Sequence, residues 1–493
     1  GSSRTEASLI QSDSALLETR VLELTDAARD KVSGAAAELA RFLAEIQFRD
    51  EKTHKKTPSA KTSMFYSPAS CDSALERAAT ADVVTALLAD PKTSAAEVAD
   101  VFDAARAAVA VTTSNTYKKT PPREPRGSRF AASFCLLGGV RWTLKRFGTP
   151  NDDPIASLTR SAAAGLISAL ARNGSVSLRV AASCGALETL SFFLATENAY
   201  AGADRNATRH ALDAAFALCF PDEVVTREGW MERDGGFFSD VFVHDANEIN
   251  DAGADGKGAA ADFNHSAPSS LGFDLTLSPY EASNDGTTSA CVASGAAARA
   301  GLAPALARLL APLNVAAREE SAGPTKPTGT AGRTGEDDDP TSYTPSGRAR
   351  DAVAWALGRL ITAPGRAGAL ARQSVFSASV AATHAFLGVV GSPAMPPRLT
   401  RALLKTLHHA SRDPVAAQGL RAAGATPKLA RCLQREDASA RESAMRALRN
   451  VCLLGESADG GTETTHPSAT ALEHAVVAGA TPHLVAVAVS SSG

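Results

Sequence analysis

Apolar residues recur at intervals of three and four positions through several long segments of the chain. This spacing places the apolar side chains along one side of a helix, while the polar residues between them face solvent. Shorter helical segments precede the long ones, as at residues 414–422. The pattern therefore predicts an all-α fold, with long amphipathic helices over residues 155–171, 205–220, 348–362, 398–410 and 438–453.

A glycine-centred motif recurs between the shorter helices. A Gly, often followed by Ala, precedes an apolar residue or Pro and then a short segment rich in Leu, Ala and Val. A Gly in the left-handed conformation ends a helix at little steric cost, and a Pro in the first turn of the next helix loses no hydrogen bond. The motif predicts helix-to-helix turns at Gly138, Gly185, Gly301, Gly424 and Gly479.

Each turn joins a short helix to one of medium length, and a long amphipathic helix follows. The three helices form a unit that recurs along the chain. The unit from residue 414 to residue 453 spans roughly forty residues, the period of helical-repeat proteins. Because each repeat of such a protein contacts only its neighbours, insertions between repeats are tolerated. The sequence thus predicts an α-solenoid with loop insertions.

Two segments carry a resemblance to the armadillo-repeat family. Residues 424–433, GATPKLARCL, look like the second helix of that repeat, and residues 443–452, SAMRALRNVC, look like the third. The resemblance covers residues 397–490 most closely, then 129–219 and 288–362, and 8–110 least. It implies a right-handed α-solenoid of degenerate armadillo-like three-helix repeats.

The insertions and changes of composition suggest four segments. We expect divergent helical repeats over 1–111, armadillo-like repeats over 112–219, an acidic, disordered insertion over 220–287, and further repeats over 288–493. The last segment carries a Gly/Pro/Thr-rich insertion at 318–347. The chain begins without Met, and its last repeat has no third helix, so we expect a piece of a longer protein.

Composition supports a folded protein inside the cell. The 44% hydrophobic content allows a large core, and roughly a fifth of the residues are Ala, which favours helix. The seven Cys form no C-x-x-C pair, as expected for a reducing compartment. No signal peptide opens the chain, and the charge-free stretch 373–397 is too polar to span a membrane. We expect a cytoplasmic location, with the nucleus as an alternative.

Motifs of catalysis and of metal binding are missing from the sequence. It has no Walker A loop, H-E-x-x-H, G-x-S-x-G or strand-borne G-x-G-x-x-G. His408 and His409 are adjacent, so on a helix they face different directions and cannot chelate one ion together. Residues 251–256 lack the oxygen ligands that a calcium loop requires. We expect no enzymatic activity, no cofactor and no bound metal.

Basic residues concentrate in the C-terminal repeats. Between residues 398 and 450 eleven Lys and Arg face four Asp and Glu, a local charge near +7, although the whole chain has a net charge of −3. On the helix over 398–410, a spacing of three and four places its cations on one side. These cations should repel one another unless an anion faces them. They are Arg398, Arg401, Lys405 and His408, with Arg412 just beyond the helix.

The third helices of armadillo proteins line a concave groove, so the resemblance implies that this stripe faces a ligand. The alternative is an ordinary solvated helix face. Import receptors of the family place Trp and Asn four residues apart, but here Arg359 follows Trp355, and Arg446 precedes Asn450. A basic groove would also repel a basic cargo. The candidate partner-binding residues are Trp355, Arg359, Arg398, Arg401, Lys405, His408, Arg446, Arg449 and Asn450.

We expect a non-catalytic armadillo-like scaffold that binds an acidic or phosphorylated protein segment. The chain's own acidic residues 221–287 are one candidate for this segment. One alternative is the regulatory tail of a larger enzyme, because residues around 403–452 resemble the armadillo tails of plant epsilon-class MAP kinase kinase kinases. The other is an RNA-binding repeat protein, against which the scarce aromatics and the negative net charge argue.

Overall fold

The computed structural model gives an all-α protein. It describes residues 2–45, 47–48, 65–66, 68–110, 128–148, 154–173, 175–196, 199–200, 204–220, 296–322, 344–363, 365–392 and 395–454. The acidic segment 221–287 and the predicted turn at Gly479 lie outside these residues. The chain divides into two units, each described by itself below. Unit 1 comprises Gly1–Phe193 with Ala201–Glu223, and unit 2 comprises Leu194–Tyr200 with Val224–Gly493.

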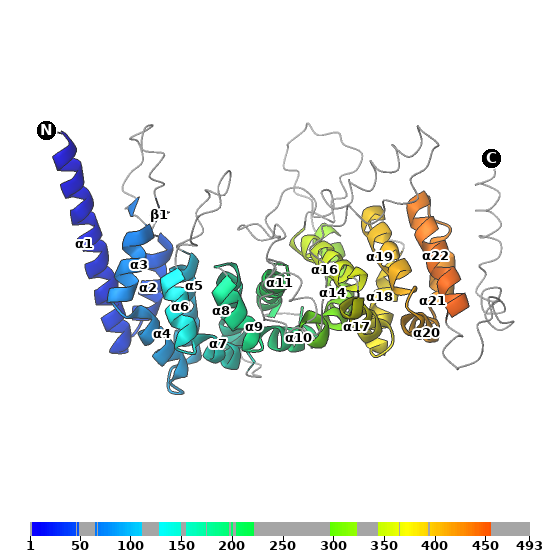
Figure 1. The fold of residues 1–493 in the computed structure, drawn as a ribbon, viewed down its shortest axis with the longest axis horizontal. Coiled ribbons are helices and arrows are strands. Elements are labelled where there is room, and N and C mark those ends of the chain that lie inside the picture. Colours follow the sequence, from blue (N-terminus) through cyan, green and yellow to red (C-terminus); the bar gives the residue numbers. More distant parts are fainter. Residues whose placement is uncertain are drawn as a thin grey trace. The chain divides into compact units, whose positions relative to one another are not determined.

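Unit 1 is built from helices α1 to α11 (Figure 1). A parallel pair of two-residue strands, β1 (Gln47–Phe48) and β2 (Phe65–Tyr66), lies between α2 and α3. The helices are α1 (Ser2–Arg29), α2 (Ala35–Glu45), α3 (Pro68–Arg77), α4 (Thr80–Ala89), α5 (Ala95–Ala110), α6 (Ser128–Leu136), α7 (Gly139–Phe147), α8 (Pro154–Arg172), α9 (Ser175–Ser183), α10 (Ala186–Leu194) and α11 (Arg205–Cys219).

Three-helix repeats account for most of unit 1. Helices α3–α5, α6–α8 and α9–α11 each combine two shorter helices with a longer third one. The long helices α5, α8 and α11 pack against one another in sequence, and α2 packs on α5. Small side chains such as Ala163, Ala164 and Ala215 are fully buried, and they allow the helices to approach closely. The repeats therefore form one continuous core within this unit.

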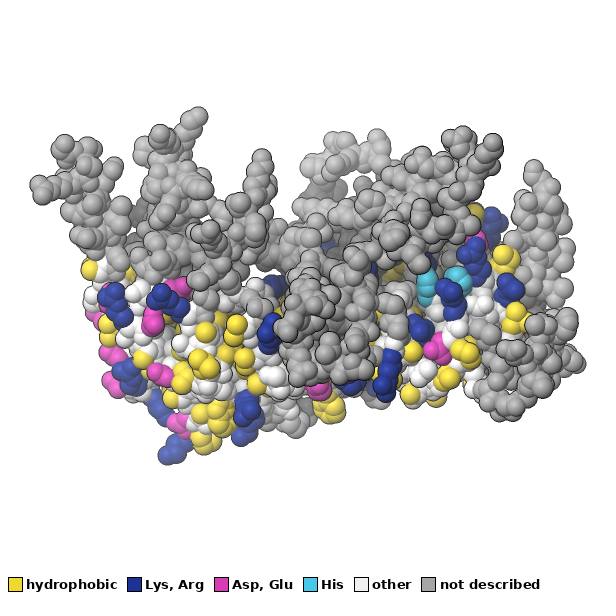
Figure 2. All heavy atoms as spheres, in the orientation of Figure 1, with side chains coloured by type: hydrophobic (Ala, Val, Ile, Leu, Met, Phe, Trp, Pro, Cys, Tyr) yellow, Lys and Arg dark blue, Asp and Glu magenta, His cyan; other side chains and the backbone are white. Residues whose placement is uncertain are grey.

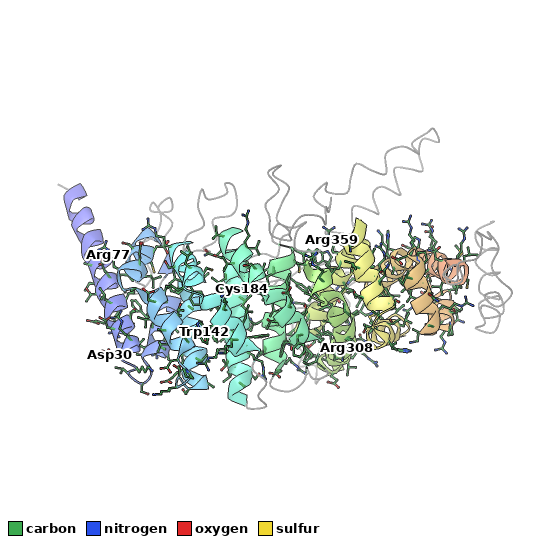
Figure 3. The ribbon with its side chains drawn as sticks, turned by 60° about the horizontal axis from the view of Figure 1, so that its bottom comes forward. Asp30, Arg77, Trp142, Cys184, Arg308 and Arg359 are labelled. Atoms are coloured by element: carbon green, nitrogen blue, oxygen red, sulfur yellow. The ribbon has the colours of Figure 1, made fainter. Side chains whose placement is uncertain are left out.

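Unit 2 repeats the same arrangement. Its helices are α14 (Leu302–Ala322), α16 (Pro345–Thr362), α17 (Gly365–Phe376), α18 (Val380–Val390), α19 (Pro397–Ala410), α20 (Pro414–Ala422), α21 (Ala425–Cys432) and α22 (Ala438–Leu454). Helices α17–α19 and α20–α22 are complete repeats, and the long helices α14, α16, α19 and α22 pack consecutively. Side chains fill the spaces between neighbouring helices (Figure 3). The predicted three-helix repeat is confirmed.

The predicted loop at 318–347 begins later than expected. Helix α14 continues through Pro312 to Ala322, because Leu313, Ala316 and Ala317 extend its buried apolar stripe beyond the proline. At the other end of this segment Thr344 caps α16, accepting a hydrogen bond from the Gly347 backbone N–H at 3.0 Å. Residues 318–322 and 345–347 of the predicted loop are thus helical.

The glycine turns are confirmed where the structure describes them. Gly138, Gly185, Gly301 and Gly424 all have φ between 72° and 84°. In the first complete repeat Ala79 occupies the matching place between α3 and α4, with φ 53°. The left-handed conformation brings the Cβ of an L-residue close to the following carbonyl oxygen, whereas Gly is free of this strain. Ala79 is therefore a strained position in unit 1.

Replacing Ala79 by Gly is expected to stabilise unit 1 by about 1 kcal/mol, because the left-handed strain disappears while some chain entropy is lost. The matched control is Ala86→Gly, at an exposed position inside α4. That change should destabilise the helix by about 1 kcal/mol. Urea unfolding followed by circular dichroism measures both variants. Destabilisation by Ala79→Gly would contradict the assignment of strain.

Candidate binding surface on the third helices

Helices α16, α19 and α22 lie side by side and run in the same direction. Arg398 on α19 meets Asp351 on α16, Arg401 meets Asp437 before α22, and Asn450 at the far end of α22 meets Ser411. Lys, Arg and His side chains gather over α19 and α22 (Figure 2). We call this surface the third-helix face, made of Arg359, Arg398, Arg401, Lys405, His408, Arg412, Glu442, Arg446, Arg449 and Asn450.

Helix α19 divides into an apolar and a basic side, as its spacing predicts. Leu399, Leu403 and Leu407 are completely buried, whereas Arg401 and Arg412 are exposed. Lys405 and His408 are partly exposed between them. Burial of the leucine side chains fixes the rotation of the helix, since turning it would expose them to water. The basic stripe is thus held outward by the core beneath it.

Carboxylates of the same unit neutralise part of this charge. The Arg401 guanidinium donates to Asp437 Oδ2, with Nε at 2.8 Å and Nη2 at 2.6 Å. Arg398 Nη2 lies 3.7 Å from Asp351 Oδ2, and Arg446 forms an ion pair with Glu442 one turn earlier. The repulsion among these cations predicted that an anion from outside would face them. Instead, three of the cations already have acidic partners within unit 2.

Asp437 both caps α22 and pairs with Arg401. Its carboxylate accepts a hydrogen bond from the Ala440 backbone N–H at 3.1 Å. Burial alone would raise the pKa of Asp437, but the hydrogen bonds from Arg401 and from the backbone outweigh burial and lower the pKa. Arg401 is half exposed, so the pair contributes little to stability. Its main effect is to orient the guanidinium along the third-helix face.

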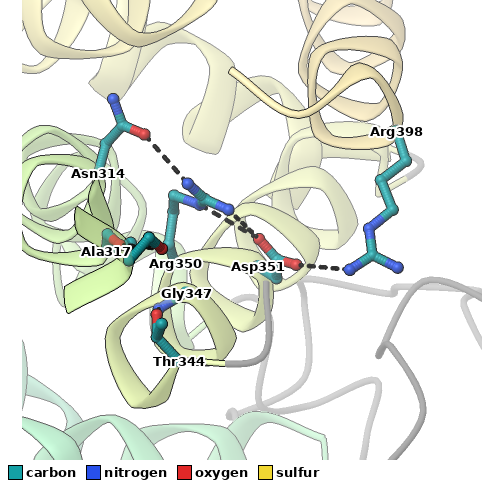
Figure 4. Close-up of polar contacts among 8 residues, drawn as sticks. Asn314, Ala317, Thr344, Gly347, Arg350, Asp351 and Arg398 are labelled. Atoms are coloured by element: carbon teal, nitrogen blue, oxygen red, sulfur yellow. Dashed lines mark hydrogen bonds and ion pairs between the residues drawn. The ribbon is translucent and has the colours of Figure 1, made fainter. Parts of the chain in front are cut away.

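A buried polar cluster supports Arg398 from below (Figure 4). The Arg350 side chain is completely buried, and its Nε and Nη2 each lie 3.2 Å from Asp351 Oδ1. Arg350 Nη1 donates to Asn314 Oδ1 on α14 at 3.1 Å. Asp351 therefore forms ion pairs with two arginines, the buried Arg350 and the partly exposed Arg398. This cluster was not predicted from the sequence, where its only signal was an Arg-Asp pair directly before the apolar part of the helix.

The far end of α19 carries cations without such partners. Within the described parts of the chain, His408, Arg412 and Arg449 form no ion pair. Burial lowers the pKa of His408, and the neighbouring Arg446 and Arg412 lower it further, against the opposing effect of Glu442. Burial and the charges of His408, Arg412, Lys405 and Arg372 lower the pKa of His409 to about 4. Because the lowered pKa values keep both imidazoles uncharged at neutral pH, the excess positive charge at this end comes from Arg412 and Arg449.

The depressed pKa of His409 predicts acid sensitivity of unit 2. In the unfolded chain this imidazole takes up a proton near pH 6.5, but in the folded chain only near pH 4. The unfolded state binds more protons between these values, so stability is lost as pH falls from 6.5 to 4. His409→Gln should flatten this dependence, by on the order of 1–2 kcal/mol at pH 4. Urea unfolding at several pH values tests it, and an unchanged slope would contradict it.

Trp355 and Asn450 have local roles. Trp355 is only 5% exposed, and the guanidinium carbon of Arg359 lies 5.8 Å from the centre of its ring. Asn450 Nδ2 donates to Ser411 Oγ at 3.1 Å, which links α22 to the end of α19. Arg449 is exposed on the same helix. Trp355 therefore packs within the unit, while Arg359 covers its ring.

The part of the chain that the structure describes holds neither a metal-ligand cluster nor a single helix able to span a membrane. No group of three or more His, Cys, Asp or Glu side chains there could hold a metal ion. No single described helix is long and apolar enough to cross a membrane, although two bent helix pairs, Val176–Ser183 with Ala186–Leu194 and Arg366–Phe376 with Val380–Val390, reach that length and apolarity together.

Comparisons with known proteins add neighbours at the level of structure only. No family model and no curated protein matches the sequence. One engineered protein from a structural genomics consortium is 15% identical, with 93% of this chain and 82% of that chain covered and a TM-score of 0.33. Another is 14% identical, with 75% and 96% covered and a TM-score of 0.35. A designed armadillo repeat protein is 10% identical, with 87% and 99% covered and a TM-score of 0.32. The helical-repeat fold itself rests on the order and packing of the chain's own helices.

Proposed function

We propose that the chain is a non-catalytic, armadillo-like scaffold whose third-helix face binds an acidic segment of a partner protein. The observation that carries the proposal is the row of cations along α19 and α22, which the leucine core holds outward. A repeat surface offers many weak contacts in a line, and an extended segment can use them together. Acidic side chains along that segment complement the charge.

The ion pairs within unit 2 orient the arginines of the third-helix face for a ligand. Arg398, Arg401 and Arg446 are each held by a carboxylate, so they lose less conformational entropy when a ligand binds. Each arginine keeps further N–H donors beyond those its partner uses. The residual positive charge comes from Arg412 and Arg449, and from His408 when it is protonated. Ordered donors and unbalanced charge together suit a segment rich in Asp and Glu.

A direct test uses the intact chain and labelled peptides of alternating Glu and Ala, with Lys and Ala peptides as the charge control. Fluorescence anisotropy should show binding of the acidic peptide alone, weakening between 0.1 M and 1 M salt as the Debye length falls from about 10 to 3 Å. Lys405→Glu with Arg449→Glu should weaken binding about tenfold or more, since about 1.4 kcal/mol corresponds to a factor of ten.

The matched control reverses two exposed arginines on other helices, Arg366→Glu on α17 and Arg431→Glu on α21. This double variant has the same net charge as the test variant, so it separates local recognition from general attraction. It should retain most of the affinity. Equal losses in the two double variants, or no binding of the acidic peptide, would refute the proposed function.

A further inference from the structure

The cations of the third-helix face have carboxylate partners at one end of the face but few at the other. Near the start of α19, Arg398 and Arg401 each face a carboxylate, Asp351 and Asp437. Toward the end of α19, fewer carboxylates lie near the basic side chains. Glu442 is the only described acidic group that acts on His408, and it is already paired with Arg446. The two ends of one surface therefore present different environments to a ligand.

Two hydrogen bonds through Ser411 join the end of α19 to α22 at this end of the third-helix face. Ser411 Oγ donates to the His408 carbonyl oxygen at 2.8 Å and accepts from Asn450 Nδ2 at 3.1 Å. Arg412 follows Ser411, and Arg446 lies one helical turn before Asn450. The charges of Arg412 and Arg446 both act on the His408 imidazole. Arg449 directly precedes Asn450 on α22 and is exposed. We call His408, Arg412, Arg446 and Arg449 the C-terminal cluster.

Two arginines of the cluster, Arg412 and Arg449, form no ion pair with any residue that the structure describes. Burial disfavours protonation of His408, and two guanidinium groups disfavour it further, so its pKa is low. A bound anion would reverse the effect of those charges and raise the pKa. The carbonyl end of α19 opposes an anion, but this effect is weaker than charge-assisted hydrogen bonds from arginine. The local chemistry therefore favours an anion that several guanidinium groups can contact at once.

We propose that the C-terminal cluster is a subsite for the phosphoryl group of a phosphoserine or phosphothreonine in the bound segment. This inference rests on the proposed function and specifies its ligand. A phosphoryl group carries nearly two charges and three acceptor oxygens, whereas a carboxylate carries one charge and two oxygens. Planar guanidinium groups match these oxygens in pairs. One phosphorylated residue would sit at this end, and carboxylates would follow toward Arg401.

The test compares three peptides on the intact chain. They share an acidic sequence of Asp, Glu and Ala and carry phosphoserine, serine or glutamate at one central position. The phosphoserine peptide should bind at least tenfold more tightly than the other two. Arg412→Ala with Arg449→Ala should abolish this preference, so that the phosphoserine, serine and glutamate peptides bind this variant with similar affinity. Arg366→Ala with Arg431→Ala, which removes two exposed arginines elsewhere, should keep the preference.

A second readout follows the His408 imidazole by NMR, with His408→Gln to assign its signal. The phosphoserine peptide should raise its apparent pKa, whereas the serine peptide should shift it little. Equal affinity for the three peptides, or a preference that survives loss of Arg412 and Arg449, would overturn the subsite and leave the proposed function standing. Equally tight binding of a single-stranded RNA would also overturn the subsite. Failure of all three peptides to bind would overturn both.

Discussion

Replacing Asp351 by Ala is expected to destabilise unit 2 by about 3–5 kcal/mol. The change leaves the completely buried Arg350 guanidinium without its anionic partner, since Asn314 supplies only a neutral oxygen. Arg398 loses its ion pair at the same time. An uncompensated charge in the interior costs far more than the loss of a surface pair. Urea unfolding followed by circular dichroism measures the loss.

Two controls separate charge from packing at this position. Asp351→Asn keeps an oxygen that can accept from Arg350, so it should cost less than Asp351→Ala. Changing both residues, Arg350→Met with Asp351→Leu, removes the buried pair together and should cost less than Asp351→Ala alone. If the double variant proves less stable than the single one, the buried-charge explanation is wrong.

Replacing Gly419 by Ala is expected to destabilise unit 2 by about 1–3 kcal/mol or more. A Cβ at Gly419 would lie 1.8 Å from the carbonyl oxygen of Phe376 and 2.9 Å from Cα of Ser377. Those atoms belong to the backbone at the end of α17, so they can move aside only by shifting the helix. Close packing between α17 and α20 thus depends on a residue without a side chain.

The matched control for Gly419 is Gly388, which lies inside α18. A Cβ there would meet no atom within 4 Å. Gly388→Ala should therefore stabilise the helix by about 0.5–1 kcal/mol, because Ala loses less chain entropy on folding. Opposite signs for the two substitutions in thermal unfolding support the packing account. A similar loss at both positions would contradict it.

Local patterns in the sequence predicted the repeats well. The expected helix over 398–410 corresponds to α19 at Pro397–Ala410. The spacing of Leu399, Leu403 and Leu407 indicates both the helical period and the side of the helix that is buried. Gly424 could be placed in a left-handed turn because few other residues tolerate that conformation. Ala79 takes the same conformation without any such signal, so only the structure shows that turn.

Contacts between residues far apart in the sequence could not be predicted from the spacing of residue types. The stripe on α19 was predicted, but its neutralisation was not, because Asp437 lies 36 residues after Arg401 and meets it only through the packing of α22. The burial of Arg350 could not be predicted either, since it depends on a partner that another helix supplies. The continuation of α14 past Pro312 likewise depends on the apolar surroundings of Leu313.

The most direct test of the central claim maps where an acidic segment binds. A Glu and Ala peptide with a photoreactive group is cross-linked to the intact chain, and the adducts are located by mass spectrometry. The account predicts adducts on α16, α19 and α22, competed by the unlabelled acidic peptide and reduced by Lys405→Glu with Arg449→Glu. Adducts confined to the first and second helices, α17, α18, α20 and α21, would contradict it.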